Sequence, residues 1–223
     1  MKKILIVLTN TTRYQHTHDA TGLWLSEATE FVAEVTKAGF AVDYVSPKGG
    51  FVPLDPRSMK YTSEADLKIY ESADFQKRAL MNSLKPSQVD PEDYVAIYYT
   101  GGHGVMWDFP DNLELQNISK TIYQQNGYVT SVCHGIAGLL NIKLDDQYLI
   151  TGKKITGFTT AEELLAGKKK VVPFLNQEVA TKHGADFQKK RAYKEFALQD
   201  GHLITGQNPF SAQAVAKQLL TNL

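Results

Sequence analysis

The chain has 223 residues, of which 43% are hydrophobic and 22% are charged, as in an ordinary soluble globular protein. Its 24 lysine and arginine residues balance 24 aspartate and glutamate residues, which leaves no net positive charge to attract nucleic acid or an anionic membrane. A single cysteine excludes an internal disulfide, and no apolar run is long enough to span a bilayer. We therefore expect a single domain over residues 1–223, in the cytoplasm, without nucleic-acid or membrane partners.

The first 45 residues predict a strand, a helix and a second strand. Residues 3–8 are predicted to form a strand, because after Lys3 they are continuously apolar, a run that is too short for a signal peptide and is typical of a strand covered on both faces. Apolar residues recur at helical spacing over residues 26–38, and Gly39 is placed to end that helix. A strand over residues 40–45 follows at once. This order indicates a right-handed parallel unit.

The next segment predicts a loop, a long helix and a central strand. Residues 46–62 are rich in proline and glycine, and residues 63–82 are expected to be helical. The inward positions of that helix are predicted to be Leu67, Ala73, Leu80 and Met81. The β-branched and aromatic run 94–99 predicts a strand that leads into the glycine-rich segment 100–110. Three glycines there let the backbone approach a ligand closely and form an anion-binding concavity.

The second half of the chain continues the alternation of helices and strands. We expect a helix over residues 111–125, a strand over 128–132 and, after the segment 154–158, a short helix over 160–166 capped by Thr159 or Thr160. Another helix is predicted near 176–183, followed by strands at 192–198 and 203–205 around a turn, and a final helix that ends at Leu220. The pattern predicts an α/β fold with a mostly parallel central sheet.

The only cysteine, Cys133, lies where the strand 128–132 meets a segment of small residues. This is the arrangement of a nucleophile elbow, in which the nucleophile stands on a tight turn at the carboxyl end of a strand. Backbone N–H groups that point at the sulfur would make the thiol partly ionised. The alternative is an inert, buried cysteine.

Four segments are expected to meet at the carboxyl edge of the sheet, where open α/β folds bind ligands. Besides Cys133 with His134, they supply Glu27, the loop residues Gly102 and His103, and a carboxylate at Glu162 or Glu163. The backbone N–H groups of His134 and Gly102 are placed to form an oxyanion hole, and the carboxylate would orient the imidazole. The alternative for Glu162 and Glu163 is a solvated first turn of a helix.

Glu27 is the candidate acid beside the thiol. If its side chain points at Cys133, burial raises its pKa, and a protonated carboxyl can donate a hydrogen bond to the thiolate and move protons. The alternative is a surface carboxylate. His16, His18 and Asp19 offer too few ligands to predict a metal site.

Five segments together resemble the ThiJ/PfpI superfamily of class I glutamine amidotransferase-like folds, and within it the glutathione-independent glyoxalase III branch, which includes heat-inducible chaperones. They are the apolar first strand, the segment from Gly22 to Glu27, and residues 100–104, 131–135 and 155–159. The resemblance implies a flavodoxin-like three-layer sandwich, usually a homodimer, that uses no cofactor or metal. It also implies roles for seven residues, namely Cys133 as nucleophile, His134 and Glu163 completing a triad, Glu27 beside the thiol, and Gly101, Gly102 and His103 for oxyanion and substrate binding.

The resemblance implies a lyase of the D-lactate dehydratase type, which converts the 2-oxoaldehyde methylglyoxal to lactate through a hemithioacetal on Cys133. Deglycase, peptidase and redox-sensor activities remain alternatives. Another alternative function is that of a holdase chaperone, which binds unfolded client proteins. Its candidate apolar contacts are Trp24, Phe51, Trp107 and Phe109. A glutamine amidotransferase would need a downstream His-x-Glu pair, and neither His183 nor His202 has the glutamate.

Overall fold

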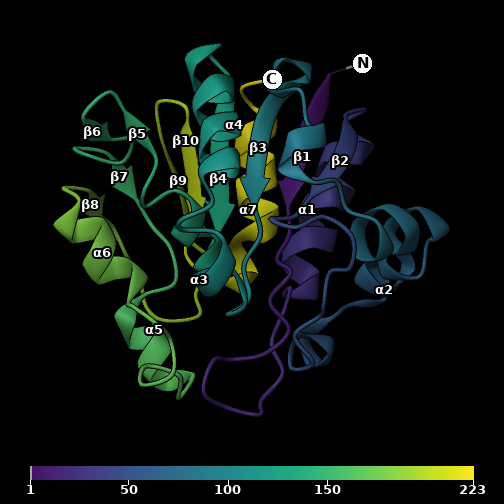
Figure 1. Ribbon diagram of the computed structural model, residues 1–223, viewed down its shortest axis with the longest axis horizontal. Coiled ribbons are helices and arrows are strands. Elements are labelled where there is room, and N and C mark those ends of the chain that lie inside the picture. Colours follow the sequence, from purple (N-terminus) through teal and green to yellow (C-terminus); the bar gives the residue numbers. More distant parts are fainter. Residues whose placement is uncertain (1) are drawn as a thin grey trace.

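The computed structural model describes residues 2–223, and its centre is a six-stranded sheet with the order β2-β1-β3-β4-β10-β9 (Figure 1). Neighbouring strands are parallel except for the last pair, in which β9 runs antiparallel to β10. The six strands are β1 (Lys3–Val7), β2 (Ala41–Val45), β3 (Tyr94–Tyr99), β4 (Tyr128–Val132), β9 (Ala197–Asp200) and β10 (Leu203–Gly206).

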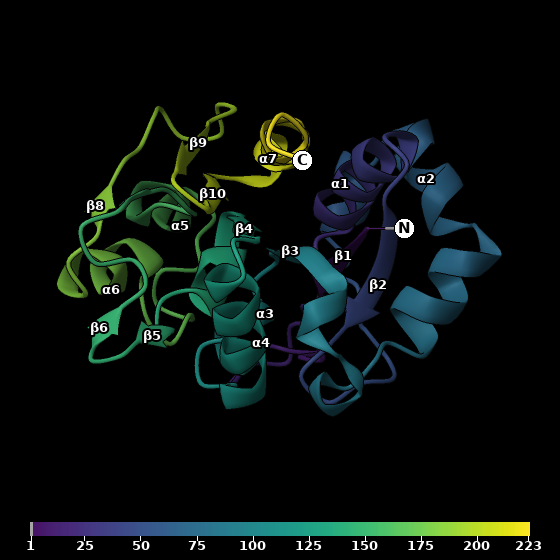
Figure 2. The ribbon, with the colours of Figure 1, turned by 90° about the horizontal axis from the view of Figure 1, so that it is seen from above.

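Helices cover both faces of the sheet, as the alternating pattern predicts. Viewed from above, α1 and α7 lie on one face, and α3 and α4 lie on the other (Figure 2). The α-helices are α1 (Leu25–Lys37), α2 (Glu64–Tyr70), α3 (Val105–Asp108), α4 (Leu113–Gln124), α5 (Thr160–Leu165), α6 (Asn176–Lys182) and α7 (Ala212–Leu220). The three-layer α/β fold is therefore confirmed. Among residues 2–223, no helix has the length and apolar character needed to cross a bilayer.

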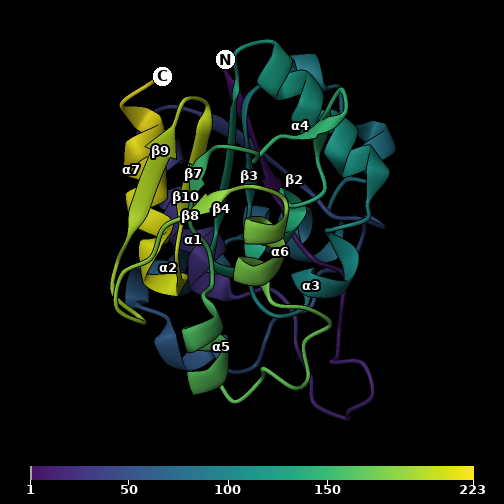
Figure 3. The ribbon, with the colours of Figure 1, turned by 90° about the vertical axis from the view of Figure 1, so that its left-hand side faces the viewer.

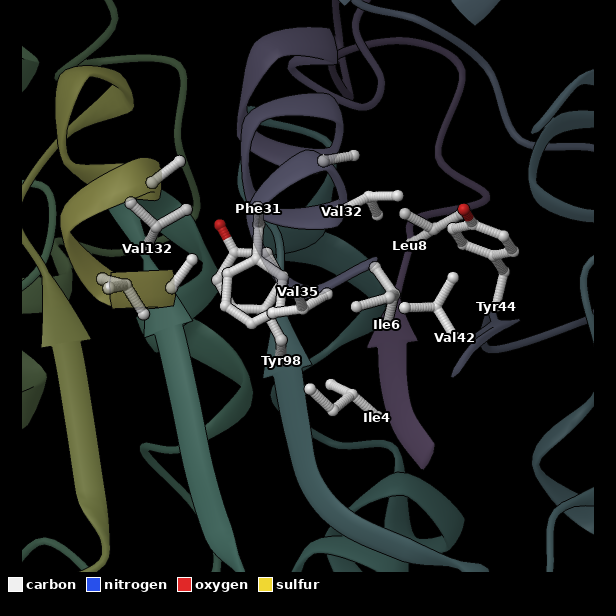
Figure 4. Close-up of a cluster of buried hydrophobic side chains, with 14 of the residues drawn as sticks. Ile4, Ile6, Leu8, Phe31, Val32, Val35, Val42, Tyr44, Tyr98 and Val132 are labelled. Atoms are coloured by element: carbon white, nitrogen blue, oxygen red, sulfur yellow. The ribbon is translucent and has the colours of Figure 1, made fainter. Parts of the chain in front are cut away.

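Two hydrophobic clusters, one on each face, hold the layers together. Ile4, Ile6 and Leu8 point to the side of α1, whereas Leu5 and Val7 point to the side of α4. This alternation explains why the first strand is apolar after Lys3. In the first cluster the ring of Phe31 from α1 stacks on Tyr98 from β3 with 3.6 Å between centroids (Figure 4).

Two small two-stranded sheets are separate from the central sheet and lie on the same side of the molecule as α5 and α6 (Figure 1 and Figure 3). They are the hairpin of β5 (Lys143–Leu144) with β6 (Gln147–Tyr148) and the parallel pair of β7 (Lys154–Ile155) with β8 (Asp186–Phe187). Short 3-10 segments lie at Ser58–Tyr61, Pro86–Gln88, Pro91–Asp93, Cys133–Gly138 and Pro209–Ser211.

The predicted helix 63–82 is wrong as a single element. It is divided into α2, which Ser63 caps, and a π-helix at Phe75–Met81. Within the π-helix Phe75 and Ala79 are buried together with the predicted Leu80, whereas the predicted Met81 is exposed, as is Ala73 before it. The predicted strand 192–198 is also wrong over most of its length, because β9 begins only at Ala197.

Candidate functional site

Cys133 lies directly after β4, at the carboxyl edge of the sheet, as predicted. Its backbone has a φ of +55°, in the left-handed region that non-glycine residues rarely adopt, and its side chain is only 2% exposed. A residue held in this conformation on a tight turn is typical of a nucleophile elbow. The expectation that the thiol is partly ionised is wrong. Burial and the nearby charge of Glu27 raise the pKa of Cys133 well above its ordinary value.

Glu27, in the first turn of α1, is fully buried beside this thiol. Its Oε2 accepts a hydrogen bond of 2.6 Å from the N–H of Gly101. Burial raises the pKa of Glu27 to about 8, against the opposing effect of the hydrogen bond from Gly101. At neutral pH the carboxyl is therefore mostly protonated and can act as an acid toward a group bound at the sulfur.

The glycine loop makes this contact possible. A Cβ atom on Gly101 would lie 2.5 Å from Glu27 Oε2 and 3.0 Å from the His134 nitrogen, so only glycine fits between them. The Gly101 N–H is engaged by Glu27 and cannot serve an oxyanion, contrary to the resemblance. Within residues 2–223, the hydrogen bonds leave the N–H of Gly102 without an acceptor.

Cys133, His134 and Glu163 form a chain of two side-chain hydrogen bonds. The Sγ atom lies 3.3 Å from His134 Nδ1, and His134 Nε2 lies 2.9 Å from Glu163 Oε2. Despite the opposing effect of burial, the charges and hydrogen bonds of the two neighbouring histidines lower the pKa of Glu163 well below its usual range. Glu163 is therefore ionised and holds the proton of His134 on Nε2, which leaves Nδ1 free to accept the thiol proton.

His103 shares the same carboxylate. Its Nε2 lies 2.8 Å from Glu163 Oε1, and its Nδ1 lies 3.0 Å from Arg57 Nη2. A guanidinium can only donate, so Nδ1 of His103 accepts and Nε2 carries the proton that bonds to Glu163. Burial and the charge of His134 lower the pKa of His103 to about 4, so the ring stays neutral. Glu163 is thus fixed by two N–H donors, and the His103 side chain acts on the carboxylate rather than on the thiol.

Glu162 is the neighbour that the sequence could not separate from Glu163, and the structure gives it a different environment. It is completely buried, and its two oxygens accept five hydrogen bonds. The donors are Thr159 N and Oγ1, Tyr193 N, Gln207 Nε2 and Asn208 Nδ2. Glu162 therefore ties the start of α5 to the C-terminal segments, while Glu163 faces the histidines.

Replacement of each glutamate by glutamine is expected to separate the two roles. Glu163→Gln turns an amide toward two N–H donors and removes the negative charge, so we expect kcat to fall about 10²-fold or more, with a smaller loss of stability of about 1–2 kcal/mol because one of the two N–H groups loses its acceptor. In Glu162→Gln the amide NH2 group faces hydrogen-bond donors that bonded to a carboxylate oxygen. This change is expected to lower the free energy of unfolding by about 2–3 kcal/mol. Steady-state kinetics and urea unfolding of both variants measure these effects. Equal kinetic losses at unchanged stability would contradict the assignment.

A cavity of about 520 Å³ opens above the thiol. Several residues that line this cavity were not predicted as site residues from the sequence. Among them are Arg57 and Lys60 from the loop after β2 and Tyr193 from the segment after β8. Tyr193 lies in a left-handed conformation, with φ at +57°. The sequence around these three residues does not indicate a site, because contacts with distant segments of the chain place their side chains at the cavity.

Other predicted residues lie elsewhere. Phe109 is buried and Trp107 and Trp24 are partly buried, so only Phe51 of the four proposed client contacts is strongly exposed. His16, His18 and Asp19 are exposed on the loop after β1. Within residues 2–223, one group of side chains could meet a metal ion, His103 with His134 and Glu163, whose ligating atoms lie within 4.8 Å of one another. Their hydrogen bonds to one another already satisfy these atoms.

Comparisons with known proteins agree with this geometry. The DJ-1/PfpI family model matches residues 20–222. The glutathione-independent glyoxalase HSP31 of Saccharomyces cerevisiae is 35% identical, and the match covers 96% of this chain and 95% of the yeast protein. The crystal structure of glyoxalase III from Candida albicans superposes with a TM-score of 0.90 at 31% identity, over 99% and 96% of the two chains. The structure of the Francisella tularensis Rapid Encystment Protein 24 kDa gives 0.96 at 34% identity, over 99% and 98%.

Proposed function

Because this chain belongs to the DJ-1/PfpI family, we propose that it is a glutathione-independent glyoxalase that converts methylglyoxal to lactate. The relatives that are named glutathione-independent glyoxalases support the reaction. The side chains around Cys133 support the role given to each residue. The nucleophile is Cys133, its base is His134, and Glu163 orients that base. Glu27 is the second acid–base group.

The position of Glu27 carries the proposal. A peptidase needs a thiol and an imidazole, but moving hydrogen between two adjacent carbons needs a second group that gives and takes protons. Glu27 supplies that group, because it is fully buried at the thiol and its pKa is raised to about 8. The two acid–base groups have different hydrogen-bond partners. Glu27 accepts a bond from the N–H of Gly101, and His134 bonds to Glu163.

In the first step, Cys133 Sγ adds to the aldehyde carbon as His134 Nδ1 takes the thiol proton. The carbonyl π bond breaks, and Glu27 protonates the new alkoxide to give a hemithioacetal. The backbone N–H groups of Gly102 and His134 stabilise the developing negative charge. This order explains how a thiol with a raised pKa can react, because it ionises only as it attacks.

In the second step, the Glu27 carboxylate removes the hydrogen of the former aldehyde carbon as a proton, and protonated His134 gives its proton to the ketone oxygen. The product is an enediol. His134 then takes the proton of the first hydroxyl while Glu27 returns its proton to the second carbon, which gives the lactoyl thioester. Water then adds to the thioester carbonyl as Glu27 takes one of its protons, and the carbon–sulfur bond breaks as protonated His134 returns its proton to Cys133. Lactic acid leaves and ionises to lactate, and all three groups are restored.

The proposal is tested by measuring methylglyoxal consumption by the dialysed protein with and without glutathione. We expect the same kcat/KM in both conditions when it is calculated on the free methylglyoxal that the hemithioacetal with glutathione leaves, because Cys133 replaces the external thiol. Consumption that requires glutathione would overturn the proposal, since the substrate would then be the glutathione hemithioacetal. The homodimer, the cytoplasmic location and the binding of unfolded clients stay predictions, and light scattering of the purified protein would test the first.

A further inference from the structure

The cavity above Cys133 is much larger than methylglyoxal requires. It has a volume of about 520 Å³, whereas pockets of roughly 300–1,000 Å³ hold drug-sized ligands, and methylglyoxal has only about five non-hydrogen atoms. Most of the space therefore lies beyond the reacting carbonyl groups. The residues around that space indicate what else the substrate carries.

Five aromatic side chains form one wall of this space, and we call them the aromatic collar. They are Phe158, Tyr193, Phe210, Tyr61 and Trp24. Phe158 lies 4.2 Å from the His134 ring, and successive centroids along the collar are 6.1, 6.4, 6.5 and 5.5 Å apart. These are ordinary distances for interacting rings. The collar thus extends without a gap from the catalytic imidazole to the opening of the cavity.

The outer rings of the collar are accessible. Tyr61 is 56% exposed and Phe210 is 47% exposed, although both lie beside other apolar rings. Exposed aromatic side chains grouped at the opening of a cavity favour an apolar or aromatic ligand. A ring attached to the ketone carbon of the substrate would lie between them while the aldehyde remains at the thiol.

The same cavity contains two cations. Arg57 is held in place by Asp55, Tyr14 and His103, through its Nε and Nη2 atoms, and Nη1 takes part in none of these bonds. Lys60 lines the cavity as well, and none of the ion pairs among residues 2–223 involves it. A fixed guanidinium edge and an unpaired ammonium are suited to a carboxylate or another anionic group.

We propose that the site accepts 2-oxoaldehydes whose ketone carbon bears an aromatic ring with an anionic group at its far end. The ring lies against the aromatic collar, and the anion faces Lys60 and Arg57. This inference rests on the proposed glyoxalase function and extends it to a substrate class.

The test compares initial rates on methylglyoxal, phenylglyoxal and 4-carboxyphenylglyoxal. Because the three aldehydes differ in intrinsic reactivity, the informative quantity is how a variant changes the ratio of two kcat/KM values. Phe210→Ala is expected to lower the phenylglyoxal to methylglyoxal ratio about fivefold, since one ring contact is lost. The matched control Phe51→Ala removes an exposed ring outside the cavity and leaves the ratio unchanged.

The charge is tested with Lys60→Met and the control Lys68→Met on α2. Lys60→Met is expected to lower the 4-carboxyphenylglyoxal to phenylglyoxal ratio about fivefold at low salt, and less at high salt, where charges are screened. If Phe210→Ala leaves the phenylglyoxal to methylglyoxal ratio unchanged, the proposed contact of the ring is wrong. If Lys60→Met leaves the 4-carboxyphenylglyoxal to phenylglyoxal ratio unchanged, the proposed preference for an anionic group is wrong. If wild type consumes none of the three aldehydes, the proposed function fails and the inference fails with it; activity on methylglyoxal alone overturns only the inference.

Discussion

Replacing Cys133 with alanine is expected to lower kcat/KM for methylglyoxal by about 10³-fold or more, because no other group in the site can form the covalent adduct. The buried sulfur occupies little volume, so the loss of stability should be about 1 kcal/mol. Steady-state kinetics with thermal unfolding of the same preparation separates the two effects.

Ser131→Ala is the matched control for this variant. Ser131 lies two residues earlier on β4, is equally buried, and its hydroxyl has no hydrogen-bond partner among the described residues. Its removal should change neither rate nor stability by much. If Cys133→Ala kept more than a tenth of wild-type activity, Cys133 would not be the nucleophile.

Replacing Glu27 with glutamine is expected to lower kcat about 10²–10⁴-fold, the range that a general acid–base group contributes. The amide keeps the shape of the side chain but cannot release or take up a proton. Glu30→Gln, one turn further along α1, is the control. Burial also raises the pKa of Glu30, to about 7, but this residue lies outside the cavity and its replacement should leave kcat within about twofold.

The raised pKa of Glu27 also predicts how activity and stability depend on pH. Above about pH 8 the carboxyl ionises, its proton is lost and its charge opposes thiolate formation, so kcat/KM of wild type should decline. In the unfolded chain Glu27 ionises near its ordinary pKa of 4.5, so its contribution to stability is complete below that pH and is lost as pH rises toward 8. Wild type should therefore lose stability over this range relative to Glu27→Gln. A parallel pH dependence in the two proteins would contradict the burial of a protonated Glu27.

The fold was predictable because its central elements carry strong local patterns. The apolar run at residues 4–8 and the β-branched and aromatic run at 94–99 admit few alternatives to buried parallel strands. The elbow at Cys133 was visible because a strand pattern ends at a cysteine followed by small residues. Parallel strands bring their carboxyl ends to one edge, so the meeting of Glu27, Cys133 and Glu163 followed from topology.

The parts that escaped prediction depend on contacts between distant segments. Residues 192–196 resemble a strand, yet the backbone N–H of Tyr193 bonds to Glu162 and that of Phe196 bonds to Ser211. Arg57 lies in a proline-rich loop, and its contact with His103 spans 46 residues. The ionisation state of Cys133 was predicted wrongly because burial and Glu27 raise the pKa of the thiol by more than the backbone N–H of His134 lowers it.

The most direct measurement of the central claim is the lactate formed for each methylglyoxal consumed in glutathione-free buffer, for wild type and Cys133→Ala side by side. The account predicts one lactate for each methylglyoxal in wild type, and only the uncatalysed background in the variant. Methylglyoxal loss without lactate, or equal lactate formation by the two proteins, would contradict it.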